Sequence, residues 1–252
     1  MKKILFVTAI ILIAAASLIA QTPTAAELLR RVDDNEIYTS IEYEGDMIIE
    51  YQNRRYVKTM RAWARGNTDS FIEFINPEDR GTKYLRTGGR LYVYSPDNER
   101  VMLISGHMLK ESMMGSDMSY EDTLENSTLS SRYDAVFANP NSETWNVNGV
   151  NREAWVLELN AKSRTESYPK RKLWIDKENG DLLHYELFAL SGAKLKEYNL
   201  KRVEVIGGQR FPVESELMDL LRRGSKTTFV MRNVNLNVNI PDSVFSQRNL
   251  TR

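Results

Sequence analysis

Cysteine is absent from the 252 residues, and histidine occurs only twice. No disulfide framework, cysteine-ligated metal site or thiol chemistry can therefore form. An excess of charge of one sign is also missing, because 34 Lys and Arg stand against 34 Asp and Glu. This balance excludes a bulk attraction for nucleic acid. The mean hydropathy of −0.45 excludes a multi-pass membrane protein.

One long apolar run is present, and it lies at the N-terminus. Lys2 and Lys3 precede the apolar residues 4–16, and the small residue Ala20 follows them. This order is typical of a secretory signal, so we expect residues 1–20 to be removed after Ala20. The alternative is an uncleaved anchor helix, although the 17 residues 4–20 are short for spanning a bilayer. Without cysteine there is no lipid attachment site, so we expect an exported protein that is free in its compartment.

The predicted mature chain, residues 21–252, begins with the pattern of one short helix. Thr24 and Glu27 have the spacing of a capping box, in which each side chain bonds the backbone amide of the other residue. Leu28, Leu29 and Val32 then recur at helical spacing on one face. We expect this helix to cover an apolar surface.

Most of the remaining chain has the pattern of an antiparallel sheet. Short β-rich runs are joined by turn dipeptides such as Gly88-Gly89, Asn148-Gly149 and Asn179-Gly180, which favour tight hairpins. Apolar residues alternate with asparagines from 233 to 240, which predicts a last strand with one buried face. About eleven to thirteen strands are expected in one domain. A sheet of this size curls, so the predicted fold is mainly β, a single large curved antiparallel sheet in a half-open barrel.

The segment from Ser105 to Ser131 interrupts this pattern and is too long for a hairpin loop. It contains four of the ten methionines, and residues 119–122 have the pattern of a cap for a short helix. Methionine suits adaptable contacts with a variable ligand. The segment is either a lid over a binding cavity or a plug that fills one end of the sheet.

Catalytic patterns are weak. A Ser–His–Asp set can be drawn around His107 and Asp117, but no Gly-x-Ser-x-Gly elbow accompanies it. His107, Asp117, Glu121 and Asp122 lack the spacing of a metal site. His184 lies in a strand pattern and is expected on a face of the sheet. We therefore expect no enzyme, no metal and no cofactor.

Four stretches carry a resemblance to a known family. Residues 113–122 read MMGSDMSYED, and residues 74–85 read FINPEDRGTKYL. Residues 91–96 read LYVYSP, and residues 237–246 read NVNIPDSVFS. Together they resemble the outer-membrane lipoprotein-sorting proteins, the LolA-like proteins of the bacterial periplasm. The stretch at 113–122 is the most specific, and the resemblance extends over nearly all of residues 21–252.

The resemblance implies an incomplete antiparallel barrel whose mouth is covered by the N-terminal helix and a central helix or loop lid. It implies a periplasmic carrier that shields acyl chains of a lipoprotein or lipid between the inner and outer membranes. The implied partners are this cargo, an inner-membrane transporter (an ABC transporter or another lipid exporter) as donor, and an outer-membrane acceptor. We expect a monomer that binds no nucleic acid. An alternative is a non-transporting sensor or accessory module that binds lipidated or outer-membrane partners, and an exported hydrolase is a third candidate.

The expected ligand-binding residues are the apolar side chains of the cavity and its lid. They are Leu28, Leu29, Val32, Trp63, Phe74, Leu109, Met113, Met114, Met118, Tyr120 and Trp155. The resemblance also implies an arginine on a strand that holds the lid closed. Arg55, Arg61 and Arg65 are candidates, and no motif selects one of them.

Overall fold

The computed structural model describes residues 22–35, 38–125 and 128–252. The predicted signal peptide and its cleavage site after Ala20 lie outside these residues. Within the described residues, no helix is both long enough and apolar enough to cross a membrane.

The predicted N-terminal helix is present as α1 (Ala25–Asn35). The Glu27 carboxylate accepts a bond from the Thr24 amide at 2.8 Å, and the Glu27 amide donates to the Thr24 hydroxyl at 3.2 Å. The predicted capping box is thereby confirmed. Leu28, Leu29 and Val32 are all buried on one side of the helix.

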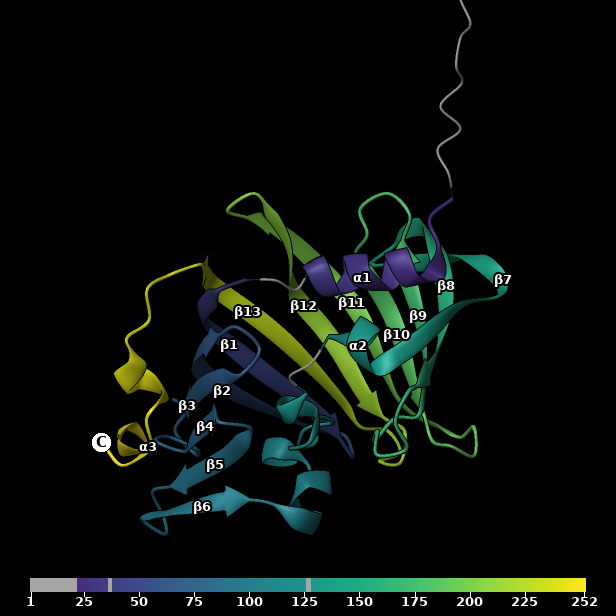
Figure 1. Ribbon diagram of the computed structural model, residues 1–252. Helices are drawn as coiled ribbons and strands as arrows, with labels where there is room; N and C mark the ends of the chain where they lie inside the picture. The colour runs from purple at the N-terminus through teal and green to yellow at the C-terminus, as the bar shows by residue number, and fades with distance from the viewer. Residues whose placement is uncertain (1–21, 36–37, 126–127) are drawn as a thin grey trace, which may run out of the picture.

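Thirteen strands form one antiparallel sheet within the described residues (Figure 1). Their bounds are β1 (Ser40–Tyr51), β2 (Arg54–Arg65), β3 (Asp69–Phe74), β4 (Lys83–Thr87), β5 (Arg90–Ser95), β6 (Arg100–Ile104), β7 (Tyr133–Val147), β8 (Val150–Ala161), β9 (Lys170–Asp176), β10 (Leu182–Phe188), β11 (Lys194–Ile206), β12 (Gln209–Asp219) and β13 (Lys226–Leu236). The spatial order is β6-β5-β4-β3-β2-β1-β13-β12-β11-β10-β9-β8-β7. Because β6 and β7 end this order without pairing to each other, the barrel stays open. The predicted half-open, mainly β fold is confirmed.

Tight turns join successive strands of the sheet. Asn148 and Gly149 join β7 to β8 with φ angles of 48° and 86°, the left-handed conformation that a two-residue hairpin turn needs. The last strand differs from the expectation. β13 ends at Leu236, Asn237 follows with a left-handed φ of 57°, and the alternating residues beyond it lie outside the strand. Their apolar members Val238 and Ile240 pack in a cluster at the C-terminus.

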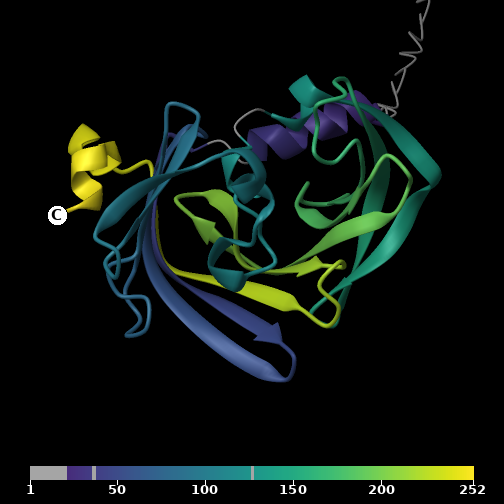
Figure 2. The same cartoon turned by 90° about the horizontal axis from the view of Figure 1, so that it is seen from below.

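The sheet wraps around an inner face that is covered in two places (Figure 2). Helix α1 packs on a cluster from β7, β8 and β9 that includes Leu157 and Ile175. The segment between β6 and β7 packs on a second cluster from β1 to β6. Among its described residues it contains four short helices, η1 (Gly106–Lys110), η2 (Met113–Gly115), η3 (Asp122–Leu124) and α2 (Leu129–Arg132).

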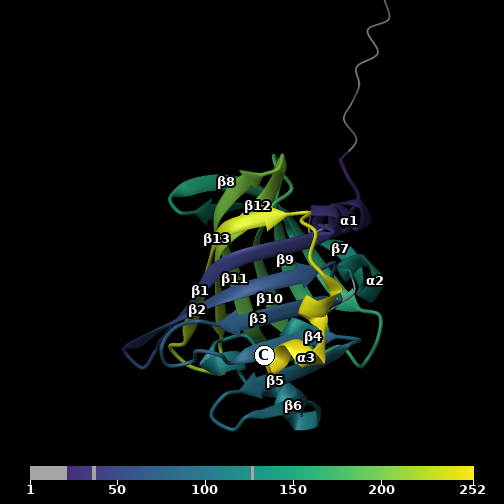
Figure 3. The same cartoon turned by 90° about the vertical axis from the view of Figure 1, so that its left-hand side faces the viewer.

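The outer face of β3 to β5 is covered by the C-terminus (Figure 3). Here η4 (Asp242–Phe245) and α3 (Gln247–Leu250) bury Phe245 and Leu250 against Phe71 and Leu85. The C-terminal segment therefore completes the core on the side away from α1.

We predict that Leu157→Ala lowers the free energy of unfolding by about 2–5 kcal/mol, because it leaves a cavity in a dry cluster. Leu157 is fully buried beneath α1. Urea unfolding followed by circular dichroism measures the change. Val150→Ala is the control on the same strand, since Val150 is 54% exposed, and we expect a change within about 0.5 kcal/mol. Equal losses in the two variants would contradict the packing described.

Candidate functional site

The central segment forms a lid over the inner face, defined here as residues 108–125. Its apolar side chains turn toward the sheet, and Met113 is only 3% exposed. They are Met108, Leu109, Met113, Met114, Tyr120 and Leu124, and they pack on Met47, Ile49, Met60, Phe74, Tyr84, Leu91, Val93 and Ile104. The Tyr84 and Tyr120 hydroxyls lie 3.3 Å apart and form the polar contact at the centre of this surface.

Asp117 fixes the tip of the lid to the sheet. This side chain is 1% exposed, yet both of its carboxylate oxygens are satisfied. Oδ2 accepts a bond from the Thr227 hydroxyl at 2.5 Å, and Oδ1 accepts one from the Asp219 amide at 3.0 Å. The Asp117 amide in turn donates to the Thr227 hydroxyl. The lid tip is therefore tied to β12 and β13 by a buried group that is costly to leave unpaired.

Asp122 forms a second attachment, in the middle of the inner face. Its carboxylate lies 2.5 Å from the Lys196 ammonium on β11 and accepts a bond from the Tyr168 hydroxyl at 2.7 Å. It also accepts a bond from the Ser119 amide, and the Asp122 amide donates to the Ser119 hydroxyl at 3.4 Å. The expected cap at residues 119–122 is present only as this reciprocal pair, because η3 begins at Asp122 and its N-cap residue, Glu121, makes no side-chain cap bond. Burial alone raises the pKa of Asp122, but Lys196 and the hydrogen bonds outweigh it and hold the pKa below its ordinary value.

An arginine on a strand also holds the lid, but it is none of the three candidates considered from the sequence. Arg86 on β4 is 9% exposed and donates to the carbonyl of Thr123 at 2.6 Å and to that of Glu125 at 3.3 Å. Arg61 instead pairs with a glutamate on β1. Arg65 pairs with Asp69 and with Asp242.

Arg55, the remaining candidate, is exposed at the start of β2. The sequence around Arg86 gave no signal, because its partners are backbone carbonyls rather than a matching side chain.

The far end of the lid meets a charged network. Glu125 accepts bonds from Arg171 at 2.5 Å and from Arg132 at 3.2 Å. Arg132 also pairs with Glu166. Its guanidinium lowers the pKa of the Glu166 carboxyl and outweighs burial, which raises that pKa. A polar seam therefore separates the apolar cluster beneath the lid from the apolar cluster beneath α1.

A cleft of about 240 Å³ opens beside the end of α1. Its apolar walls come from Val32, Leu182, Tyr185, Tyr198, Leu200 and Val203, and Asn35, Asp181 and Arg210 also line it. The rings of Tyr185 and Tyr198 stack at 4.8 Å with an interplanar angle of 6°. Burial raises the pKa of Tyr185, so this hydroxyl stays protonated. The cleft is smaller than ligand pockets, which usually measure about 300–1,000 Å³.

The residues expected at the site divide between these surfaces. Phe74, Leu109, Met113, Met114 and Tyr120 meet beneath the lid, and Leu28, Leu29, Val32 and Trp155 meet beneath α1. Met118 is half-buried at the lid tip, where its carbonyl accepts a bond from the Met113 amide.

Trp63 lies apart from all of these residues. It packs with Phe71 in the cluster at the C-terminus, with ring centroids 6.0 Å apart. The sequence analysis missed Arg86, Lys196, Arg171 and the Tyr185–Tyr198 pair.

The groups around His107 do not assemble into a reactive set. His107 is exposed in η1, and both oxygens of Asp117 are engaged by β12 and β13. Glu121 pairs with Lys110, and Asp122 pairs with Lys196. Each carboxylate therefore has a partner: that of Glu121 lies within the lid, and those of Asp117 and Asp122 attach the lid to the sheet.

Comparisons with known proteins agree with this architecture. A family model described as "Uncharacterized protein" matches residues 66–252. No curated protein matches the sequence. A DUF1329 family protein from Desulfovibrio piger is 24% identical, with a TM-score of 0.78 over 90% of this chain and 97% of that one.

Two further solved structures share the fold. A domain described as an outer membrane lipoprotein-sorting protein, from Vibrio parahaemolyticus, is 20% identical, with a TM-score of 0.75 over 90% of this chain and 98% of that one. A LolA superfamily protein from Nitrosomonas europaea is 19% identical, with a TM-score of 0.70 over 90% of this chain and all of the other. The resemblance inferred from the sequence is therefore matched by a shared fold.

We predict that Asp122→Asn lowers the free energy of unfolding at pH 7 by about 1–3 kcal/mol, because it removes the charge that Lys196 and Tyr168 bind. The folded-state pKa of Asp122 lies below its ordinary value. Its contribution is therefore full above an ordinary carboxyl pKa of about 3.9 and is lost as the pH falls through the folded value. Urea unfolding between pH 7 and pH 3 should show the two proteins converging in acid.

Asp134→Asn is the matched control, because that carboxylate is 77% exposed. We expect it to follow the wild-type protein at every pH. A difference between Asp122→Asn and wild type that persists unchanged at pH 3 would contradict the ionic attachment.

Proposed function

The chain belongs to the family whose model matches residues 66–252, and we propose that it is a periplasmic carrier of acyl chains. In this proposal it shields a lipoprotein or lipid in transit from the inner to the outer membrane. The observation that carries the proposal is the lid, which covers an apolar inner surface yet is attached through separate polar groups on β4, β11 and β13.

Acyl chains are a suitable cargo for such a surface. Transfer of an acyl chain out of water yields about 0.8 kcal/mol per CH₂, so a sixteen-carbon chain gains on the order of 12 kcal/mol. A carrier must release the same chain, which argues against a rigid complementary pocket. The methionines of the lid supply flexible apolar contacts that fit chains of different shape.

Cargo entry requires that the covers move. The cleft of about 240 Å³ is too small for an acyl chain in the closed arrangement. Displacement of the lid would uncover Met47, Ile49, Phe74 and Tyr84 on the sheet. Displacement of α1 would extend this surface to Leu157 and Ile175. The two apolar clusters would then be open on either side of the polar seam, with the cleft beside the end of α1.

The export of the protein and the transfer of its cargo follow from this role. Residues 1–20 act as an export signal cleaved after Ala20, and residues 21–252 act as one carrier domain. An inner-membrane transporter, of the ABC class or another lipid exporter, loads the cargo, and an outer-membrane acceptor receives it. The carrier works as a monomer and holds its cargo by contact, without a covalent step. A sensor or accessory module on the same fold would keep its lid closed in the presence of acyl chains.

We predict that the triple variant Met113→Asp, Met114→Asp and Met118→Asp loses uptake of a fluorescent fatty-acid probe. Carboxylates at positions 113 and 114, whose side chains pack toward the sheet, would face the apolar chain without partners, and position 118 adds a third at the lid tip. Fluorescence titration measures uptake, and circular dichroism checks that the sheet is retained. Met102→Asp is the control, because this residue is 43% exposed on the edge strand β6, and we expect unchanged uptake. Wild-type uptake by the triple variant would disprove the role of the lid.

A second prediction addresses the cleft. Val203→Trp fills the space beside Tyr198 and should weaken probe binding by at least about tenfold, which corresponds to about 1.4 kcal/mol. Val205→Trp, two residues along β11, is the control because Val205 is 66% exposed. Native mass spectrometry of protein purified gently from membranes gives an independent readout. Co-purified lipid or lipoprotein supports the carrier, whereas a clean protein that takes up no probe supports the sensor.

A further inference from the structure

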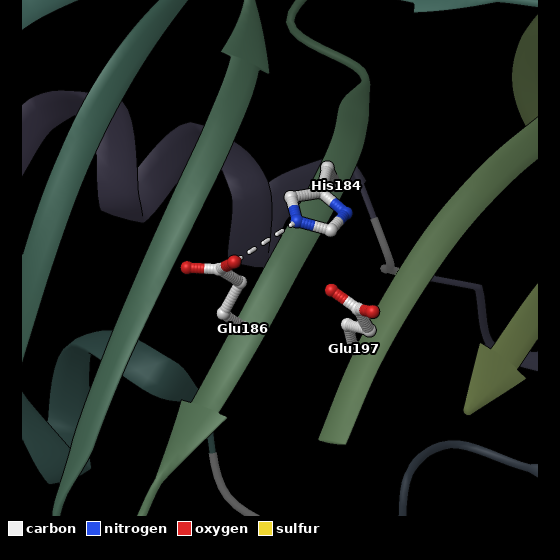
Figure 4. A group of neighbouring side chains, drawn as sticks. All are labelled: His184, Glu186 and Glu197. Carbon is white, nitrogen blue, oxygen red and sulfur yellow. Dashed lines mark ion pairs between the residues drawn. The ribbon is translucent and has the colours of Figure 1, made fainter. Parts of the chain in front are cut away.

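Three potential ligand side chains meet on β10 and β11, away from the lid. His184 and Glu186 extend from β10, and Glu197 extends from the neighbouring β11 (Figure 4). One nitrogen or oxygen atom from each residue lies within 4.8 Å of the others. From the sequence we expect no metal and expect His184 on a face of the sheet, and the two glutamates join it only through the pairing of β10 with β11.

The strand geometry explains why the cluster lies on the outer face. Tyr185 lines the cleft on the inner face, so its neighbours His184 and Glu186 point to the other side. Glu186 is paired directly with Glu197 across the two strands. The group therefore lies behind the Tyr185–Tyr198 wall of the cleft.

The histidine is held so that one nitrogen faces the carboxylates. Its Nδ1 lies 2.5 Å from the Tyr198 carbonyl oxygen and 2.9 Å from the Asn199 Oδ1. Both of these atoms are acceptors, so Nδ1 carries the proton. Nε2, on the other side of the ring, faces the Glu186 Oε1 at 3.8 Å.

This ring is also fixed in orientation. Trp145 stacks on it with ring centroids 4.1 Å apart and an interplanar angle of 17°, and Trp174 meets it edge-on with ring centroids 4.7 Å apart. The side chain is 2% exposed, so its position is determined by packing. A cation placed between Nε2 and the Glu186 carboxylate would contact both groups without any movement of the ring.

The two glutamates favour a cation between them. Like charges placed directly opposite on neighbouring strands destabilise a sheet. The Lys194 ammonium lies 2.7 Å from Glu186 and 3.0 Å from Glu197 and supplies one positive charge. Lys194 is about one-third exposed and sits at the first position of β11, so its long side chain has room to swing outward.

We propose that His184, Glu186 and Glu197 bind a divalent transition-metal cation of the zinc type, with Lys194 in the cation position when the metal is absent. An imidazole nitrogen with two carboxylate oxygens is a donor set suited to such ions. The bond from Nδ1 to the Tyr198 carbonyl supplies the outer contact that orients a metal-bound histidine. The ion would join β10 to β11 directly behind the cleft.

The test is a Zn²⁺ titration of the chelator-treated mature chain by calorimetry and thermal unfolding. We expect one saturable site and an unfolding temperature that rises with Zn²⁺ concentration. Ni²⁺ or Co²⁺ at the same site should quench tryptophan fluorescence, because Trp145 and Trp174 contact His184. Glu197→Gln should weaken binding by at least about tenfold. Glu158→Gln, an exposed carboxylate on β8, and His107→Ala, the other histidine, should leave binding unchanged.

Lys194→Met separates a metal site from a simple ion-pair cluster. Removal of the competing ammonium should tighten Zn²⁺ binding, and circular dichroism confirms that the variant is folded. The proposal is overturned if neither the wild-type protein nor Lys194→Met binds Zn²⁺ saturably. It is also overturned if binding disappears in His107→Ala and persists in Glu197→Gln. Uptake of the fatty-acid probe is measured separately, so failure here leaves the carrier proposal intact.

Discussion

An antiparallel sheet of thirteen strands that does not close must have its inner face covered, and the rest of the structure follows from this constraint. The inner face carries large apolar side chains at both ends, and exposure of such surface to water costs about 25 cal/mol per Å². Helix α1 covers one end by apolar packing and by polar groups near its C-terminal end, where Asp33 accepts bonds from the Leu129 and Ser130 amides and Asn35 donates to the Gly180 carbonyl. The lid covers the other end with methionines and is secured by charged and hydrogen-bonded groups. Both covers therefore combine apolar packing with polar attachments.

Local features of the fold were accessible from the sequence because they depend on residues close together in the chain. The capping box at Thr24 and Glu27 needs a spacing of three residues, and the turn at Asn148 and Gly149 needs two. The strand number follows from the spacing of such turns. The end of β13 was not accessible, because the left-handed Asn237 interrupts an alternation that continues in the sequence beyond the strand.

The candidate site was only partly accessible, for a related reason. The apolar residues of α1 and the lid were found from periodicity and composition. The groups that attach the lid were not, since Asp122 and Lys196 are 74 residues apart and meet only when the sheet folds. Arg86 was missed because it bonds carbonyl groups, which every residue possesses. Trp63 lies on the outer face because each strand alternates its side chains, and composition does not show the direction of each one.

The lid has a mechanical consequence that its role as a cover does not reveal. Its attachments come from β4 on one half of the sheet and from β9, β11 and β13 on the other half. The two halves also meet where β1 pairs with β13. The lid therefore links the two halves across the inner face, on the side opposite that strand pair. Its release would let the two halves move apart about the β1–β13 pair and would widen the inner face.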